Sequence, residues 1–322
     1  MTSMIKVVMT ALALGIMNTG AGADEYPSRP VRIITAMAAG GMSDRAIRLI
    51  TEPLERQLGQ PLIVENRSGA GGVIGTEAAS RAPADGYTLL VSMASTFSII
   101  PAVKKASYDP LRDFVPLGQI WYAPQALVVR SNSSLKTIGE LVAYAKANPD
   151  RLSFASAGNG TSTHLSILLL AREAGIKVIH VPYRSGGQSV ADVLGGQVEA
   201  VFSDISALVP HIQSGALRAL AVTAPQRSSL LPNVPSMAEA GLPGVSTINW
   251  FGLHALAGTP PAVLARLKAA VRAAQLDPAY KAAMAKNAMT TGTVGAEPFG
   301  EMIREEAQRL APVVRSSGIS FN

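Results

Sequence analysis

The chain has 322 residues, of which 48% are apolar and 16% charged, and this balance excludes an intrinsically disordered protein. It contains no cysteine, which excludes disulfides, thiol catalysis and thiolate metal sites. The formal net charge is +6, but Lys and Arg are scattered and do not cluster with aromatic residues, so we expect no nucleic-acid partner.

The first 23 residues have the features of a secretory signal peptide. Lys6 precedes an apolar run over residues 7–17, and small residues follow up to Ala23. The apolar run is shorter than the roughly 20 residues that span a bilayer, and an A-x-A-like cleavage site follows it. We therefore predict an exported protein that is cleaved near Ala23, and an uncleaved membrane anchor is the alternative.

After this segment, the chain alternates short apolar strands with amphipathic helices. Residues 31–37 predict a buried strand, and residues 43–59 have apolar side chains at helical spacing with a glycine at the end. The same alternation continues to residue 93 and begins again near residue 151. Uninterrupted apolar strands between helices indicate parallel sheets covered on both faces, so we predict an α/β protein with two similar lobes. The tail from Pro260 has the pattern of helices, and we expect it to pack on the first lobe.

Two glycine-rich turns lie at corresponding places in the two units. AAGGMSDRA, residues 38–46, follows the first strand, and AGNGTSTHL, residues 157–165, follows the first strand of the second unit. A helix that begins after such a turn has unpaired N–H groups and a partial positive charge, so it can receive an anion. The hydroxyls of Ser43 in the first turn and of Thr161, Ser162 and Thr163 in the second can cap the helix or donate to a ligand. Each turn alone can be an ordinary capped helix start, but two at the carboxyl ends of strands predict a ligand cleft between the lobes.

Other candidate sites have weaker support. GAGGVIG, residues 69–75, resembles a dinucleotide-binding fingerprint, but Ile74 occupies its sixth position, and we expect no cofactor. The four histidines lack metal-ligand spacing, and we expect no metal. Asp204 ends an apolar strand, and it either aims its carboxylate into the cleft or caps the next helix. A hydrolase or lyase that uses Asp44, His164 and Asp204 is the catalytic alternative, although no nucleophile stands beside an obvious base.

Ordered blocks along the chain resemble the extracytoplasmic solute receptors of the tripartite tricarboxylate transporter system, the Bug family. The matching segments are YPSRPVRIITAMAAGGMSD, LGQPLIVENRSGAGGVIGTE, APADGYTLL, YDPLRDFVPLG, AYAKANPDRLSFASAGNGTSTHL, HVPYRSGGQSVADVLGGQVEAVFSD, GALRALAVTAPQRSSLLPNVPSMAEAGLPG and TINWFGLHALAGTP. The resemblance implies a type II periplasmic binding protein, not an enzyme, whose two lobes close on a small carboxylate. It also implies delivery to a membrane permease, and we expect the receptor to be a monomer.

On this resemblance, lobe 1 comprises residues 24–127 and 248–322, and lobe 2 comprises residues 128–247. Each lobe is expected to be a mostly parallel sheet flanked by helices. The resemblance places the carboxylate between the two glycine-rich turns, partly through ordered waters. The expected ligand-binding residues are Ala38, Ala39, Gly40, Gly41, Ser43, Asp44, Thr96, Gly158, Asn159, Gly160, Thr161, Thr163, His164 and Asp204.

Two departures from the family pattern concern the ligand. Ala36 and Met37 stand where the family usually has Pro and an aromatic residue, and Ile100 replaces a common Asn. These changes predict a more apolar pocket and a bulkier ligand, such as an aromatic acid. A receptor that serves as a sensor for signalling, without a permease, is the alternative that the sequence leaves open.

Overall fold

The computed structural model describes residues 26–40, 42–102, 106–287 and 289–316. The predicted signal peptide, residues 1–23, lies outside these ranges. Within them, every helix is too short or too polar to cross a membrane.

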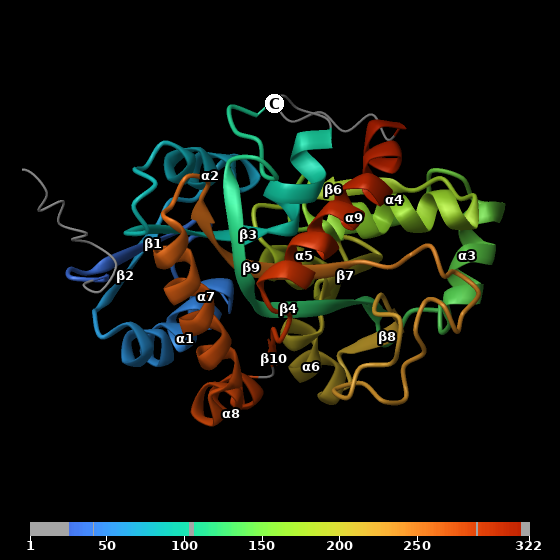
Figure 1. The fold of residues 1–322 in the computed structure, drawn as a ribbon. Coiled ribbons are helices and arrows are strands. Elements are labelled where there is room, and N and C mark those ends of the chain that lie inside the picture. The colour runs from blue at the N-terminus through green and yellow to red at the C-terminus, as the bar shows by residue number, and fades with distance from the viewer. Residues whose placement is uncertain (1–25, 41, 103–105, 288, 317–322) are drawn as a thin grey trace, which may run out of the picture.

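Two groups of three parallel strands form the centres of the two halves (Figure 1). Their bounds are β1 (Val31–Thr35), β2 (Leu62–Asn66), β3 (Thr88–Met93), β5 (Ser153–Ser156), β6 (Ile179–Pro182) and β7 (Ala200–Asp204). In the first group β1 lies between β2 and β3, and in the second β5 lies between β6 and β7. The apolar central strands β1, β3 and β7 are almost entirely buried, as expected for parallel strands between layers of helices.

One long strand, β4 (Phe114–Arg130), belongs to both halves. As far as Pro124 it pairs antiparallel with β9 (Ile248–Leu256), and from Gln125 it pairs antiparallel with β7. Two short strands also pair with β4, namely β8 (Leu217–Val222) and β10 (Thr290–Thr291). The sheet therefore runs continuously in the order β2-β1-β3-β9-β4-β7-β5-β6. The change of partner at Pro124 and Gln125, which we call the crossing, falls slightly before the proposed lobe boundary at residues 127/128.

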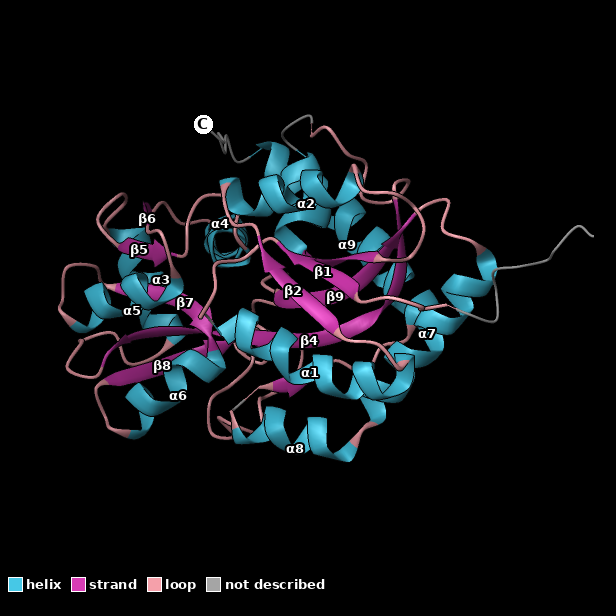
Figure 2. Cartoon of the chain, turned by 90° about the vertical axis from the view of Figure 1, so that its left-hand side faces the viewer, coloured by secondary structure: helices cyan, strands magenta, loops and turns pink. Residues whose placement is uncertain are grey.

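Helices cover both faces of the sheet in each half (Figures 1 and 2). Their bounds are α1 (Met42–Leu58), α2 (Val73–Ser80), α3 (Ile138–Ala147), α4 (Ser162–Ala174), α5 (Gly186–Leu194), α6 (Ile205–Gln213), α7 (Pro261–Leu276), α8 (Pro278–Lys286) and α9 (Ala296–Ser316), with the short turns η1 (Ala70–Gly72), η2 (Ser95–Ile99) and η3 (Ile100–Ala102). In the first half, α1, α7 and α8 pack on one face, and α2, η2 and the start of α9 pack on the other. In the second half, α3 and α4 cover one face, and α5 and α6 cover the other. Each half is thus a doubly wound unit with its own core.

The C-terminal helix α9 packs on the first half, where we expect the tail to lie, and it continues into a core of the second half. Phe299 and Ile303 lie in a core of the first half. Leu310, Val313 and Val314 lie in a core of the second half with α3 and α4. In Figure 1, α9 runs from beside β4 towards α4. Apolar residues occur along the whole helix, so its sequence does not show which core each end meets.

The direction of β4 brings the carboxyl ends of the parallel strands of both halves together. Since β9 is antiparallel to both β3 and β4, β4 runs parallel to β3 and leaves the first sheet at the edge where β1 and β3 end. In the second half β4 is antiparallel to β7, so it enters at the edge where β5 and β7 end. The turns after β1 and β5 therefore both border the crossing, the position at which open α/β sheets bind ligands.

Candidate ligand-binding cleft

The turn between β1 and α1, residues 36–41, is held in shape by Asp44, and we call it jaw 1. Asp44 Oδ2 accepts hydrogen bonds from the Gly40 amide and from Arg48 Nε, both at 3.0 Å, and Oδ1 accepts one from Asn66 Nδ2 at 2.8 Å. Burial opposes ionisation of this carboxyl, but the hydrogen bonds outweigh it and hold the pKa of Asp44 below its ordinary value. Asp44 is therefore a charged group whose oxygens organise the turn itself.

The tip of jaw 1 is open to solvent. Ala38, Ala39 and Gly40 are exposed, and Gly40 has a φ of 82°, which glycine adopts without strain. Gly41 and the side chain of Ser43 lie outside the described residues. The first N–H groups of α1 have no intrahelical acceptor, as in any helix. Jaw 1 therefore presents main-chain donors and the positive end of a helix.

The turn between β5 and α4, residues 157–161, forms a closed hydrogen-bond network, and we call it jaw 2. Thr161 caps α4: its Oγ1 accepts from the His164 amide at 3.4 Å and donates to the Gly158 carbonyl at 2.7 Å. Thr163 Oγ1 accepts from the first amide of the turn and lies 2.9 Å from Thr161 Oγ1. Both hydroxyls are engaged within the turn, whereas Asn159 at its tip is exposed.

Two stacked histidines support jaw 2. The rings of His164 and His180 lie 3.7 Å apart and are inclined by 12°. The Gly160 amide donates to His164 Nδ1 at 3.3 Å, so this nitrogen carries no proton and the ring is neutral. Burial, together with the neighbouring His180, lowers the pKa of His164 to about 3. A ring with this pKa supports the turn and does not accept a proton near neutral pH. In the part of the chain that the structure describes, His, Asp and Glu form no group of three that could hold a metal.

Thr96 lies behind jaw 1 and is fully buried. Its hydroxyl donates to the Met93 carbonyl at 3.3 Å. A Cβ on Gly72 would lie 2.8 Å from the Thr96 methyl and 3.3 Å from Ala36 Cβ, which shows how closely these segments pack. The glycine-rich segment 69–75 thus serves as a close-packed support for jaw 1, and Thr96 is part of that support.

Asp204 lies at the crossing, where it pairs with Gln125 of β4. It occupies the N-cap position of α6, but within the described ranges its side chain makes no capping hydrogen bond to that helix. Asn249 Nδ2 donates to Asp204 Oδ2 at 3.3 Å, and the buried Oδ1 has no hydrogen-bond partner among the described residues. Burial raises the pKa of Asp204 to about 7, against the effect of the Asn249 hydrogen bond.

Comparison with known proteins identifies the family of this chain. The model of the tripartite tricarboxylate transporter family receptor matches residues 46–319, which is most of the chain. The chain belongs to this family. Its members are periplasmic solute-binding receptors, so the prediction of a receptor and not an enzyme is confirmed.

Individual relatives of this receptor agree in sequence and in fold. BugT of Bordetella pertussis is 36% identical over 323 residues, which cover 99% of this chain and 98% of BugT. The structure of R. palustris Rpa4515 with adipate has a TM-score of 0.82 and 29% identity over 92% of this chain and 99% of its own. MatC (Rpa3494) from Rhodopseudomonas palustris with bound malate has a TM-score of 0.78 and 31% identity over 90% of this chain and 100% of its own. The resemblance to the Bug family and the periplasmic binding protein fold are confirmed.

A buried polar network in this tripartite tricarboxylate receptor was not predicted from the sequence. Gln125 Nε2 donates to Ser162 Oγ at 2.8 Å, and Ser166 Oγ donates to Gln125 Oε1 at 2.6 Å. Ser166 Oγ also lies 2.6 Å from Thr247 Oγ1, just before β9. The network connects the start of α4, behind jaw 2, to both segments that pass between the halves. Its only signal in the sequence is a glutamine in the otherwise apolar end of a strand.

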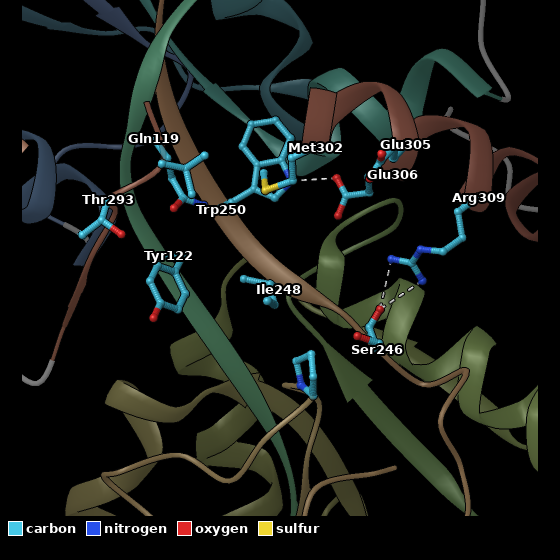
Figure 3. A pocket seen from close by; sticks show the side chains of 12 residues that line it. Gln119, Tyr122, Ser246, Ile248, Trp250, Thr293, Met302, Glu305, Glu306 and Arg309 are labelled. Atoms are coloured by element: carbon cyan, nitrogen blue, oxygen red, sulfur yellow. Dashed lines mark hydrogen bonds between the residues drawn. The ribbon is translucent and has the colours of Figure 1, made fainter. Parts of the chain in front are cut away.

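A cavity of about 690 Å³ lies on the α9 side of the crossing strands (Figure 3). Its lining, as far as the structure describes the chain, includes none of the predicted ligand residues. Glu306 accepts hydrogen bonds from Trp250 Nε1 at 2.6 Å and from Ser98 Oγ at 2.7 Å. The lining contains two carboxylates, Glu305 and Glu306, against one cation, Arg309. Burial raises the pKa of Glu306, so these groups leave no clear charge preference, and the jaws remain the candidate site for a carboxylate because of their helix N-termini.

Proposed function

We propose that the receptor captures a small carboxylate between jaw 1 and jaw 2 and delivers it to a membrane permease of the tripartite tricarboxylate type. The proposal rests on the strand directions: β1 and β5 both end at the sheet edges next to the crossing, and each is followed by a helix N-terminus, of α1 and of α4. Such ends attract anions through their free N–H groups and the helix dipole. Adipate in Rpa4515 and malate in MatC support a carboxylate as the ligand.

Binding is proposed to require closure of the two lobes, residues 24–127 with 248–322 and residues 128–247, around the crossing. Micromolar affinity corresponds to about 8 kcal/mol. Hydrogen bonds to a charged group contribute about 1.5–3 kcal/mol each, so three or four donors suffice only if both jaws contact the ligand together. The ligand then favours the closed form. The network around Gln125 supports this mechanism because it links jaw 2 to both crossing segments.

Within the carboxylates, we propose an acid with a bulky apolar body, such as an aromatic acid. Ala36, at the base of jaw 1, is small and 4% exposed, and Ile100 is fully buried. A Cβ on Gly71 would lie 3.3 Å from Ile100 Cδ1, so Ile100 forms part of the apolar support behind jaw 1. A site that binds citrate or glutamate far better than benzoate would contradict this choice of ligand.

The ligand class can be tested by thermal unfolding of the chain from Asp24 onward with aliphatic and aromatic carboxylates. Neutral amides of the same acids serve as controls. An acid present at 100 times its dissociation constant should add about 2.7 kcal/mol to the free energy of unfolding, which raises Tm. A rise with acids and not with amides supports the proposal. If no acid raises Tm, the jaws do not bind carboxylates.

Thr161→Ala tests whether jaw 2 takes part in binding. The substitution removes the cap of α4 at the proposed contact, so affinity for the acid should fall about tenfold. Thr137→Ala is the matched control, because Thr137 caps α3 outside the jaws. Both variants should lose about 1 kcal/mol of stability, and only Thr161→Ala should lose affinity. Equal affinities of the two variants, measured by calorimetric titration, would remove Thr161 from the site.

Export and delivery need separate measurements. We propose cleavage near Ala23, which N-terminal sequencing of the protein recovered from the periplasm checks directly. Delivery predicts that the receptor with bound acid retains a membrane permease in a pull-down, and that the receptor without acid retains less of it. Recovery of a signalling protein instead of a permease would favour the sensor alternative.

A further inference from the structure

Two buried oxygen atoms without partners lie at the strand ends that face the crossing. One is Oγ1 of Thr35, the last residue of β1, and the other is Oδ1 of Asp204, the last residue of β7. Among the described residues, the third and last such atom is Trp121 Nε1. Buried polar atoms without a hydrogen-bond partner are rare and costly in folded proteins. Each half thus contributes one oxygen without a partner among the described residues, at the carboxyl end of a strand.

The neighbours of Asp204 show what kind of partner is missing. Asn249 satisfies Oδ2, and α6 does not use the carboxyl as a side-chain cap in the described structure. β5 and β7 run in parallel, with Ala155 opposite Val201, so jaw 2 and Asp204 follow adjacent strand ends. Oδ1 is therefore a buried atom at the strand end beside jaw 2, and when the carboxyl is ionised it is an acceptor that lacks an N–H or O–H donor among the described residues.

A bare carboxylate would be a poor neighbour for this oxygen. Two carboxylates in one site repel each other, and one of them must then bind a proton. Burial already raises the pKa of Asp204 to about 7, so an additional negative charge nearby would be unfavourable. A ligand hydroxyl or ammonium group removes this conflict, because it donates to Oδ1 while the ligand carboxylate lies at the helix N-termini of the jaws.

We propose that Asp204 Oδ1 accepts a hydrogen bond from a hydroxyl or amino group of the bound acid and thereby selects substituted acids over their unsubstituted analogues. The inference rests on the proposed function, since it assumes that an acid binds between the jaws. It specifies the ligand further: the acid carries a donor in addition to its carboxylate.

Matched pairs of acids test the selection by calorimetric titration. Malate and succinate differ by one hydroxyl, as do mandelate and phenylacetate, and aspartate adds an amino group to succinate. In the wild-type chain, the hydroxyl or amino member should bind about tenfold more tightly or better. In Asp204→Ala, the two members of each pair should bind with similar affinity.

Asp204→Asn separates hydrogen bonding from charge. Asn keeps an acceptor oxygen, so a preference for a hydroxyl should largely remain, whereas a preference for an ammonium group requires the negative charge and should disappear. Asp150→Asn is the control, because it removes an exposed carboxylate from the second half without touching the cleft. It should leave every affinity ratio unchanged. Unfolding temperatures of the ligand-free variants establish that each one folds.

Each remaining outcome contradicts a different statement. If acids bind but both members of every pair bind equally in the wild-type chain, the role of Asp204 is wrong and the receptor function stands. If Asp204→Ala still binds the hydroxyl or amino member of each pair more tightly, as the wild type does, a water molecule is the hydrogen-bond donor to Oδ1 and the inference is again wrong. If none of these acids binds, the proposed function itself fails.

Discussion

Asp44, His164 and Asp204 stand in or beside the jaws, yet their surroundings shift their pKa values for different reasons. Hydrogen bonds keep Asp44 charged in spite of its burial. Burial raises the pKa of Asp204 to about 7 and lowers that of His164 to about 3, so in both cases it favours the neutral form. The permanent charge of jaw 1 therefore belongs to a side chain that organises the turn, and the charge of Asp204 depends on pH and on its partner.

Replacing Asp204 should change how stability depends on pH. Its pKa is raised from about 4 in the unfolded chain to about 7 in the folded one, so its contribution is present below pH 4 and is lost as pH rises to 7. Relative to the wild type, the free energy of unfolding of ligand-free Asp204→Asn should rise by up to about 4 kcal/mol between pH 4 and pH 8. Urea unfolding at both pH values measures this gain. If the difference in free energy of unfolding between Asp204→Asn and the wild type is the same at pH 4 and pH 8, Asp204 ionises normally.

His164 should have the opposite dependence on pH. Its folded pKa is lowered to about 3, so the stability it contributes is present above about pH 6.5 and is lost as pH falls towards 3. His164→Gln should therefore lose less stability than the wild type between pH 7 and pH 4. His211→Gln, which removes a histidine from α6 away from jaw 2, is the control. An unchanged acid sensitivity of His164→Gln would mean that His164 is accessible to protons.

Short segments whose shape depends on close packing determine where the jaws lie. The segment from Gly69 through α2 packs against the base of jaw 1, and glycine is required at position 75 because neighbouring backbone leaves no room for a side chain. A dinucleotide-binding turn uses glycine for the same reason, the close approach of backbone and partner. The resemblance of the two patterns therefore reflects a shared steric requirement, with Ala36 as the partner in this chain.

Gly75→Ala should be strongly unfavourable. The new Cβ would lie 2.6 Å from the Arg67 carbonyl oxygen and 2.7 Å from Ala36 Cα, both backbone atoms that must move. We expect a loss of about 1–3 kcal/mol in the free energy of unfolding, together with weaker acid binding, since jaw 1 must shift. Gly139→Ala in α3 is the control. Its Cβ meets nothing closer than 3.9 Å, so it should stabilise the protein by about 0.5–1 kcal/mol. Equal changes in the free energy of unfolding for Gly75→Ala and Gly139→Ala would contradict the close contact between Gly75 and Ala36.

At the scale of the whole molecule, two elements tie the halves together. β4 supplies a strand to the sheet of each half, and α9 supplies apolar side chains to a core of each. Neither half can unfold without withdrawing one of these elements from the other. The proposed closure of the halves must therefore bend β4 near Pro124, the chain near Ile248 and α9, which all pass between them.

The shared elements predict that the ligand-free receptor unfolds in one cooperative transition. Leu310→Ala, at the end of α9 that lies in the second half, should lower the stability of that single transition by about 2–5 kcal/mol. Leu111→Ala is the control, because Leu111 is 50% exposed and its loss should matter little. Differential scanning calorimetry distinguishes one cooperative unfolding transition from two separate ones. Two separate transitions, with only one of them lowered by Leu310→Ala, would mean that the halves are independent.

The sequence by itself determined the elements and the family. The apolar periodicity located the parallel strands and most of the helices, and Thr161, one of three neighbouring residues whose hydroxyls were candidates for a cap or a ligand contact, caps α4. These properties depend on residues within one or two turns of each other, which a local pattern records. The ordered blocks of the Bug family likewise lie in the chain itself, and the family model confirms them.

Only the tertiary structure decided which partners these elements meet. The change of β4 from β9 to β7, the division of α9 between two cores and the unpaired oxygen of Asp204 all depend on contacts between residues far apart in the chain. Asp204 and Asn249, for example, are 45 positions apart. Burial and hydrogen-bond partners set the pKa of a carboxyl, and neither is recorded in the residues beside it. The chemistry of the cleft is therefore a property of the folded chain.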